Sequence, residues 1–294
     1  MKSIVKVNVD RDVCLRDFFK SNERFEAIVN AVLFHGKKIV IPEHIHELDS
    51  NQAILTDKSI DYNDQDNKKR DVVRKVWINN GYVIIAIENQ HESKRNMVAR
   101  CGNYDMLRYL DQLENKSEVY GVITIVLFTG EHRWKNPKTI MYAIGVIHQE
   151  VKEFIHEYKA YIEDVKDINP EEISDEESRV LMEGIQGVYA MKKDTSKQLD
   201  YLSMSQEVAL YVAVVTEFEE LLDKVKEAKE GEMIHMCDAL DNLREAYKQE
   251  GIAQEQKKSV QTMISKGFDI TVIAECLSLT KEQIEAYIEP IPAV

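Results

Sequence analysis

The fold of this chain is decided by residues 71–90, which read DVVRKVWINNGYVIIAIENQ. Two runs rich in β-branched and aromatic residues flank Asn80-Gly81. Asn-Gly between such runs is the strongest short-range signal of a β-hairpin. A two-residue loop at Asn80-Gly81 places Asp71 opposite Gln90 across the hairpin.

This register gathers three polar side chains at one end of the hairpin. Residues that lie opposite each other point to the same face, and so do residues two apart on one strand. Asp71, Glu88 and Gln90 are therefore predicted to share a face. A three-residue loop would shift the register by one and scatter them, so this prediction depends on the turn.

Two carboxylates beside a buried strand repel each other and lose hydration unless a cation joins them. Magnesium suits such a site, because it takes carboxylate oxygens and keeps several waters. A bound water with a lowered pKa is a nucleophile for phosphodiester cleavage. The alternative interpretation is that Glu88 is a strand-end residue paired with Arg70 or Arg74 in solvent.

The neighbouring segments predict the rest of a sheet domain. A helix is expected to start at Ser21-Asn22 and to close at His35-Gly36, and a second helix is expected over about 96–113. Residues 121–128 form another β-rich run. The order strand, strand, helix, strand, with nearly continuous apolar strands, indicates an α/β fold in which helices cover both faces of a mixed sheet.

From about residue 147 onward the pattern is mostly α-helical and acidic. The net charge is −14 overall, but it is +1 over residues 1–150 and −15 over residues 151–294. A polyanion site is therefore expected in the first half. We predict three parts: a core at 1–146, an acidic helical region at 147–250, and a linker helix with a small helix-turn-helix-like unit at 251–294.

Composition narrows the class of protein. Hydrophobic residues make up 44% and charged residues 31% of the chain, as in globular proteins. No apolar run reaches the roughly 18–20 residues of a membrane span, and the start of the chain lacks the apolar segment of a signal peptide. The four cysteines lie far apart, without paired zinc spacing. We expect a cytoplasmic protein that does not enter the membrane.

The chain resembles the recombination-promoting nuclease family, also called PD-(D/E)XK nuclease family putative transposases. The resemblance rests on segments whose order and spacing match along most of the chain. They are Phe25…Asn30-Ala31-Val32-Leu33-Phe34…Gly36, Ile41-Pro42-Glu43, Arg70-Asp71-Val72-Val73, Ile87-Glu88-Asn89-Gln90, Met97…Arg100…Tyr104-Asp105…Tyr109-Leu110…Gln112, Val126-Leu127-Phe128-Thr129-Gly130-Glu131…Trp134 and Met236-Cys237-Asp238-Ala239-Leu240.

The resemblance implies a restriction-endonuclease-like core and a Mg²⁺-dependent DNA endonuclease linked to recombination or transposition, with Mn²⁺ as a second candidate metal. Asp71 and Glu88 would be the metal-binding carboxylates. Gln90 stands where the wider superfamily has a catalytic lysine; an amide carries no charge, so Gln90 is expected to orient the attacking water. Glu26 is a candidate acidic helper, with a solvated helix face as the alternative.

Basic residues around the motif suggest contacts with DNA phosphates. Arg100, Tyr104 and Arg108 recur at helical spacing and form one stripe. Arg70 and Arg74 belong to a local basic track that also includes Lys68, Lys69, Lys75, Lys94 and Arg95. Arginine gives bidentate phosphate contacts and a tyrosine hydroxyl can donate to phosphate. The alternative for both groups is ordinary solvated surface.

Two functional hypotheses follow. The first is a metal-dependent DNA endonuclease that uses Asp71, Glu88 and Gln90. The alternative is a non-catalytic protein that keeps the nuclease fold for DNA binding or assembly. In either case DNA is the expected partner, and the helical C-terminal region is where a homo-oligomer would form. The recognition helix of the terminal unit carries Glu282, Glu285 and Glu289, so protein contact there is as reasonable as DNA binding.

Overall fold

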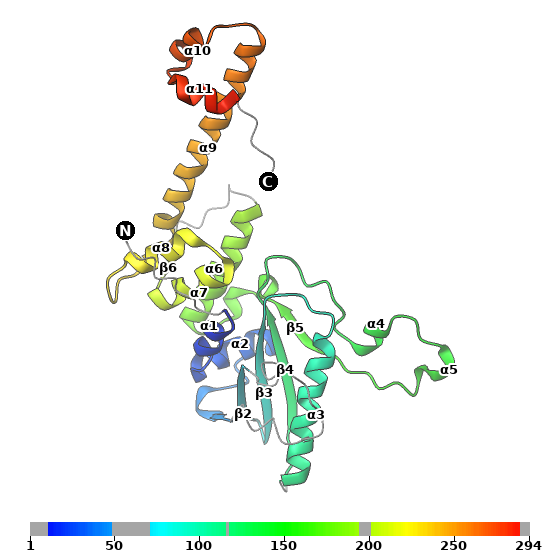
Figure 1. Ribbon diagram of the computed structural model, residues 1–294. Helices are drawn as coiled ribbons and strands as arrows, with labels where there is room; N and C mark the ends of the chain where they lie inside the picture. The colour runs from blue at the N-terminus through cyan, green and yellow to red at the C-terminus, as the bar shows by residue number, and fades with distance from the viewer. Residues whose placement is uncertain (1–10, 49–70, 116–117, 194–200, 289–294) are drawn as a thin grey trace. The chain divides into compact units, whose positions relative to one another are not determined.

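The computed structural model describes residues 11–48, 71–115, 118–193 and 201–288 (Figure 1). The chain divides into two compact units, Met1–Met236 and Cys237–Val294. The predicted boundary at 146/147 falls inside the first unit, and the boundary at 250/251 falls within the long helix α9 (Met236–Ser265).

The first unit is built on a five-stranded mixed sheet, which confirms the predicted α/β class. The strand order is β1-β2-β3-β4-β5, and β1 to β3 pair antiparallel whereas β3 to β5 pair parallel. The strands are β1 (Ile45–Glu47), β2 (Val72–Ile78), β3 (Gly81–Gln90), β4 (Gly121–Phe128) and β5 (Tyr161–Asp164).

The hairpin of β2 and β3 differs from the prediction by two residues in register. Ile78 pairs with Gly81, so the loop is Asn79-Asn80 and the glycine opens β3. Asn79 has φ of 53°, a left-handed conformation that asparagine tolerates better than most residues. The predicted loop is wrong, but a slip of two residues keeps every side chain on its face.

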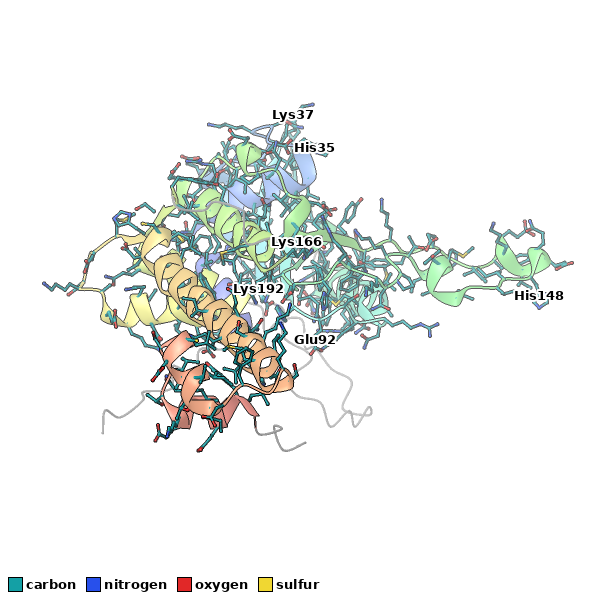
Figure 2. The ribbon with its side chains drawn as sticks, turned by 90° about the horizontal axis from the view of Figure 1, so that it is seen from above. His35, Lys37, Glu92, His148, Lys166 and Lys192 are labelled. Atoms are coloured by element: carbon teal, nitrogen blue, oxygen red, sulfur yellow. The ribbon has the colours of Figure 1, made fainter. Side chains whose placement is uncertain are left out.

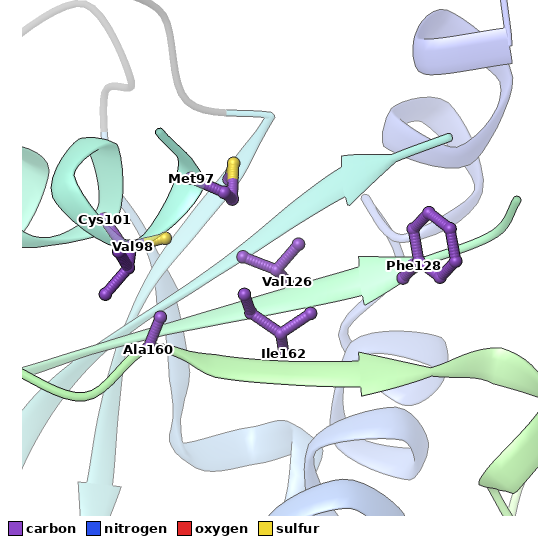
Figure 3. Close-up of a cluster of buried hydrophobic side chains, with 7 residues drawn as sticks. All are labelled: Met97, Val98, Cys101, Val126, Phe128, Ala160 and Ile162. Atoms are coloured by element: carbon purple, nitrogen blue, oxygen red, sulfur yellow. The ribbon is translucent and has the colours of Figure 1, made fainter. Parts of the chain in front are cut away.

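Helices cover both faces of the sheet (Figure 1). On one face, Leu15 and Phe19 line the same small cavity as Ile87 and Leu127 of the sheet. The helices on this side are α1 (Arg11–Phe18) and α2 (Asn22–Phe34), and the Ser21 side chain caps α2 as predicted. The other face carries α3 (Met97–Asn115). Figure 3 shows its first turns against β4 and β5, in a cluster of Met97, Val98, Cys101, Val126, Phe128, Ala160 and Ile162.

Helices from the acidic half complete the first unit. They are α6 (Glu176–Lys193), α7 (Gln206–Thr216) and α8 (Glu219–Glu227), with the short pair β6 (Ser203–Met204) and β7 (Ile234–His235) and the 3₁₀ turns η1 (Pro42–His44), η4 (Val165–Asp167) and η5 (Pro170–Glu172). The Arg24 guanidinium on α2 pairs with Glu177 of α6 and with Glu207 of α7. These helices therefore belong to the same body as the sheet.

An arm, residues 130–160, connects β4 to β5. It carries α4 (Ile140–Ile144) and α5 (Gln149–Lys152), and a β-bridge between Thr139 and Lys159 closes its base. Figures 1 and 2 show the arm extending away from the sheet, with His148 near its far end.

The second unit contains most of α9 together with α10 (Ile270–Leu277) and α11 (Lys281–Ile288). Its core consists of the buried side chains Val260, Ile273, Leu279 and Ile284. Across the described parts of the chain, no helix has the length and apolar character needed to cross a membrane.

Candidate functional site

The predicted residues Glu88 and Gln90 lie at the carboxyl end of β3. Glu88 and Gln90 are buried, with 4% and 9% of their surface exposed. Val72 pairs with Ile87, so Asp71 just before β2 stands opposite Glu88 when the register is continued. The prediction that Asp71 stands opposite Gln90 is wrong by two residues. Glu88 and Gln90 lie two apart on β3 and so share one face, and that Asp71 joins them there stays a prediction from the continued register.

A backbone hydrogen bond holds Asp71 in this corner. Its Oδ2 accepts from the N–H of Asn89 at 2.8 Å. The bond joins the start of β2 to the residue between Glu88 and Gln90. An anchored carboxylate has fewer rotamers to lose when it binds a ligand.

Helix α3 lies over this face of the sheet. Glu88 pairs with Val126, and Val126 packs against the first turns of α3 (Figure 3). From this helix, Arg100 Nη2 donates to the hydroxyl of Tyr104 at 3.2 Å, and the guanidinium carbon lies 5.8 Å from the Tyr104 ring centre. The predicted pair Arg100 and Tyr104 is thus brought together beside Glu88.

Burial and neighbouring charges shift the pKa values of Arg100 and Tyr104 beside Glu88. Burial works to lower the pKa of the Arg100 guanidinium, but the hydrogen bond to Tyr104 and the charge of Glu88 outweigh it, so the pKa is raised. Burial raises the pKa of Tyr104; the Arg100 hydrogen bond opposes that shift and the Glu88 charge adds to it. The site therefore holds a permanent cation and a neutral phenol next to a buried carboxylate.

Arg74, one of the predicted basic residues, is not placed for a phosphate contact. Arg74 is 5% exposed, donates to the carbonyls of Val73 and Lys20, and pairs with Glu47 at 3.3 Å. The prediction of a surface phosphate contact by Arg74 is wrong, because the side chain faces the packed interior. Arg70 lies outside the described residues.

The rest of the α3 stripe is also buried. Arg108 has no exposed surface and lies 3.6 Å from Asp111 on the same helix. Tyr104 is 5% exposed. Neither alternative of the sequence analysis, phosphate contact or solvated surface, describes Arg108.

Glu26 makes contacts that tie elements together. One carboxylate oxygen accepts from the Asn30 amide, and the other accepts from the Ser174 hydroxyl at 3.1 Å. These bonds connect α2 to the segment that leads into α6. The side chain is buried, so the solvated-face alternative is wrong, and a helper role toward the metal stays a prediction.

The loop after β4 supports the site and was missed by the sequence analysis. Thr129 N–H donates to the Gln90 carbonyl at 3.0 Å, and the Thr129 hydroxyl bonds Asn89 Oδ1 at 3.1 Å. A Cβ on Gly130 would overlap with the His91 carbonyl oxygen. The segment Phe128-Thr129-Gly130-Glu131 appeared in the family resemblance, but nothing in its residue types marks it as the partner of β3.

Lys166 is a second feature that the sequence analysis missed. Its ammonium donates to the carbonyls of Gly130 and His132 and pairs with Asp164 at 2.8 Å. Burial lowers the pKa of Lys166, while Asp164 opposes that shift. Lys166 and Lys192, both labelled in Figure 2, have their ammonium groups 5.3 Å and 5.9 Å from the ring centre of Tyr189. Lys166 therefore stabilises the loop that borders the site.

Within the described residues, no group of three or more His, Cys, Asp or Glu side chains is arranged to hold a metal ion. The Asp71 and Glu88 pair is a two-carboxylate set. Magnesium is commonly held by one or two carboxylates together with waters and substrate phosphates, so this oxygen donor set fits it.

A sequence model of the family described as "Putative transposase, YhgA-like" matches residues 14–223. The chain belongs to this family of PD-(D/E)XK putative transposases. The resemblance drawn from the motifs is thereby confirmed. No curated protein and no solved structure matches the chain.

Membership in this family connects the chain with transposition or recombination, and hence with DNA. The matched segment runs from α1 into α8 and lies wholly within the first compact unit. The family region therefore includes the helices α6 and α7 as well as the sheet.

Proposed function

We propose that this protein is a metal-dependent DNA endonuclease that acts in recombination or transposition. The observation that carries the proposal is that Glu88 and Gln90 are buried on one face at the end of β3, with the Asp71 carboxylate bonded to the N–H of the residue between them. Burying the Glu88 carboxylate near a second carboxylate, that of the half-buried Asp71, costs free energy without a cation to neutralise the charge. A protein that only binds DNA has no use for two neighbouring carboxylates, whereas a metal-dependent nuclease needs them to hold its ion.

Each residue has a distinct role in this proposal. Asp71 and Glu88 would hold Mg²⁺, or Mn²⁺, through carboxylate oxygens. When bound, the ion supplies charge neutralisation and lowers the pKa of water. Gln90 offers both an amide N–H and a carbonyl oxygen, so it orients the attacking water without adding charge.

The reaction is hydrolysis of a phosphodiester. The water oxygen forms a bond to phosphorus, and one P–O ester bond breaks. The proton of the water passes to solvent, and the leaving sugar oxygen takes a proton from solvent. No oxidant or second substrate is needed.

Plasmid nicking with the full chain tests the proposal. We expect the wild type to nick supercoiled DNA in Mg²⁺ and to stop in EDTA, and we expect Asp71→Ala and Glu88→Gln to lose roughly 100-fold or more in rate. Asp223→Asn is the matched control, because Asp223 is an exposed acid on α8 that pairs with Lys226.

Two outcomes would overturn the proposal. Cleavage that survives Asp71→Ala or ignores EDTA would show that the activity arises elsewhere. A wild type that binds DNA but never cuts it, in Mg²⁺ or Mn²⁺, would favour the non-catalytic alternative.

A further inference from the structure

The proposed site lacks a cation among its three motif residues. Asp71 and Glu88 are acids and Gln90 is neutral, while the DNA phosphate brings a further negative charge. In the transition state of phosphoryl transfer, charge is spread over the non-bridging oxygens, and preorganised cations stabilise it. A metal ion alone leaves this corner short of positive charge.

Lys166 and Arg100 are two partly or fully buried cations near this end of the sheet. The ammonium of Lys166 is already committed to Asp164 and to the carbonyls of Gly130 and His132. An ammonium has three donors, so these contacts use them all. Lys166 is not free to meet a substrate.

The position and the contacts of Arg100 differ from those of Lys166. It lies on the first turn of α3, over the strand pair that contains Glu88, and one of its Nη groups bonds Tyr104. Its Nε is buried, and within the described part of the chain it has no hydrogen-bond partner. A guanidinium carries five N–H donors in a fixed fork, so it keeps donors available for an incoming anion.

Resting on the function proposed above, we infer that Arg100 is a catalytic residue that donates to a non-bridging oxygen of the scissile phosphate. Tyr104 is its positioning residue, because the hydroxyl accepts from Nη2 and thereby sets the direction of the guanidinium fork.

The test separates turnover from DNA binding. Cleavage rate is measured at saturating DNA in Mg²⁺, and affinity is measured by fluorescence anisotropy of a labelled duplex in Ca²⁺. We expect Arg100→Met to lower the rate roughly 100-fold while affinity changes less than about fivefold. Arg100→Lys should recover part of the rate, because it restores the charge but not the fork.

Two controls accompany these variants. Arg179→Met removes a guanidinium that pairs with Glu176 and Glu183 on α6 and should leave the rate unchanged. Thermal unfolding of each variant shows whether a loss of rate is only a loss of folded protein.

The role of Tyr104 is tested by a double-mutant cycle. Tyr104→Phe should lower the rate about three- to tenfold in the wild-type background and have almost no effect in the Arg100→Met background. A merely structural role of the hydroxyl would instead give equal losses in both backgrounds and would overturn the positioning role.

The outcomes distinguish this inference from the proposed function. An active wild type with an equally active Arg100→Met overturns the inference alone, and so does a loss that lies wholly in DNA affinity. An inactive wild type overturns the proposed function and this inference with it.

Discussion

Gln90, the last residue of β3, is the motif position at which a change of charge is most informative. Gln90→Lys adds a cation near a bound metal, and like charges a few ångströms apart repel strongly in a site poor in water. We expect activity to be lost at limiting Mg²⁺ and to return at least partly at high Mg²⁺. Gln90→Ala should lose roughly tenfold or more in turnover with little change in metal affinity, since an amide contributes little to holding the ion.

Titration of cleavage rate against Mg²⁺ concentration for the wild type and both variants measures these effects. If Gln90→Ala follows the wild-type curve throughout, Gln90 does not belong to the site.

Arg24 gives a residue-scale prediction about stability and pH. Its guanidinium bonds Glu207, and this contact lowers the pKa of Glu207 below its usual value of 4.5. A depressed carboxyl pKa adds stability that is present above the unfolded value and is lost as pH falls through the folded value. Arg24→Met should therefore lower the free energy of unfolding by about 1–2 kcal/mol at pH 7, a figure already reduced because Glu207 is partly exposed.

Urea unfolding of the wild type and Arg24→Met between pH 7 and pH 3.5 measures the difference in their free energies of unfolding. This difference should shrink below about pH 4.5. Arg179→Met is again the matched control, since it breaks a more exposed pair and should cost less than about 0.5 kcal/mol. A cost for Arg24→Met that is independent of pH would point to lost packing on Phe18, whose ring centre lies 4.1 Å from the guanidinium, rather than to the ion pair.

At the scale of elements, the site depends on how closely the loop after β4 approaches the end of β3. A Cβ at Gly130 would overlap with the His91 carbonyl oxygen and would lie 2.6 Å from the Phe128 ring. Gly130→Ala must therefore shift the backbone next to Gln90, and we expect a cost of about 1–3 kcal/mol together with reduced cleavage. Differential scanning calorimetry and plasmid nicking measure the two effects.

Gly81→Ala is the control for this prediction. Gly81 lies in the hairpin and has a negative φ, and a Cβ added to it would have no other atom within 4 Å. It should leave both stability and cleavage nearly unchanged. Equal behaviour of the two alanine variants would show that the close approach at Gly130 does not matter for the site.

At the scale of the whole molecule, the two compact units predict where the chain can be shortened. Removal of residues 251–294 leaves the first unit and its core intact, so we expect a folded protein with a thermal transition and DNA cleavage. The expected loss is in self-association or targeting. Circular dichroism melting and light scattering measure fold and mass.

A shorter protein that ends at Lys193 provides the contrast. It lacks α7 and α8, and with them Glu207 and the carbonyl of Val215 that accepts from the Tyr189 hydroxyl at 3.1 Å. We expect it to be insoluble or without a cooperative transition. If the protein lacking 251–294 behaves in the same way, the terminal unit is needed by the first unit for folding.

The sequence by itself determined the hairpin, the helices on either side of it and the face that Glu88 and Gln90 share. These features depend on local patterns: runs of β-branched residues around a turn signal, caps such as Ser21, and the parity of positions along two strands. Parity explains why the shared face survived an error in the loop. A slip of two residues changes the partner of each strand residue but not the side of the sheet to which its side chain points.

Only the tertiary structure decided which basic residues lie beside Glu88 and which are held by contacts within the fold. Arg74, Arg100, Arg108 and Lys166 look alike as sequence positions, yet Arg74 is bonded to the carbonyls of Val73 and Lys20, and Lys166 is bonded to the loop after β4. The burial and the hydrogen-bond partners of these side chains come from residues far apart in the chain. Arg24 of α2, for example, pairs with Glu177 of α6 in the acidic half. Local patterns carry no information about such contacts, because the energy of a buried charge depends on the neighbours that folding brings to it.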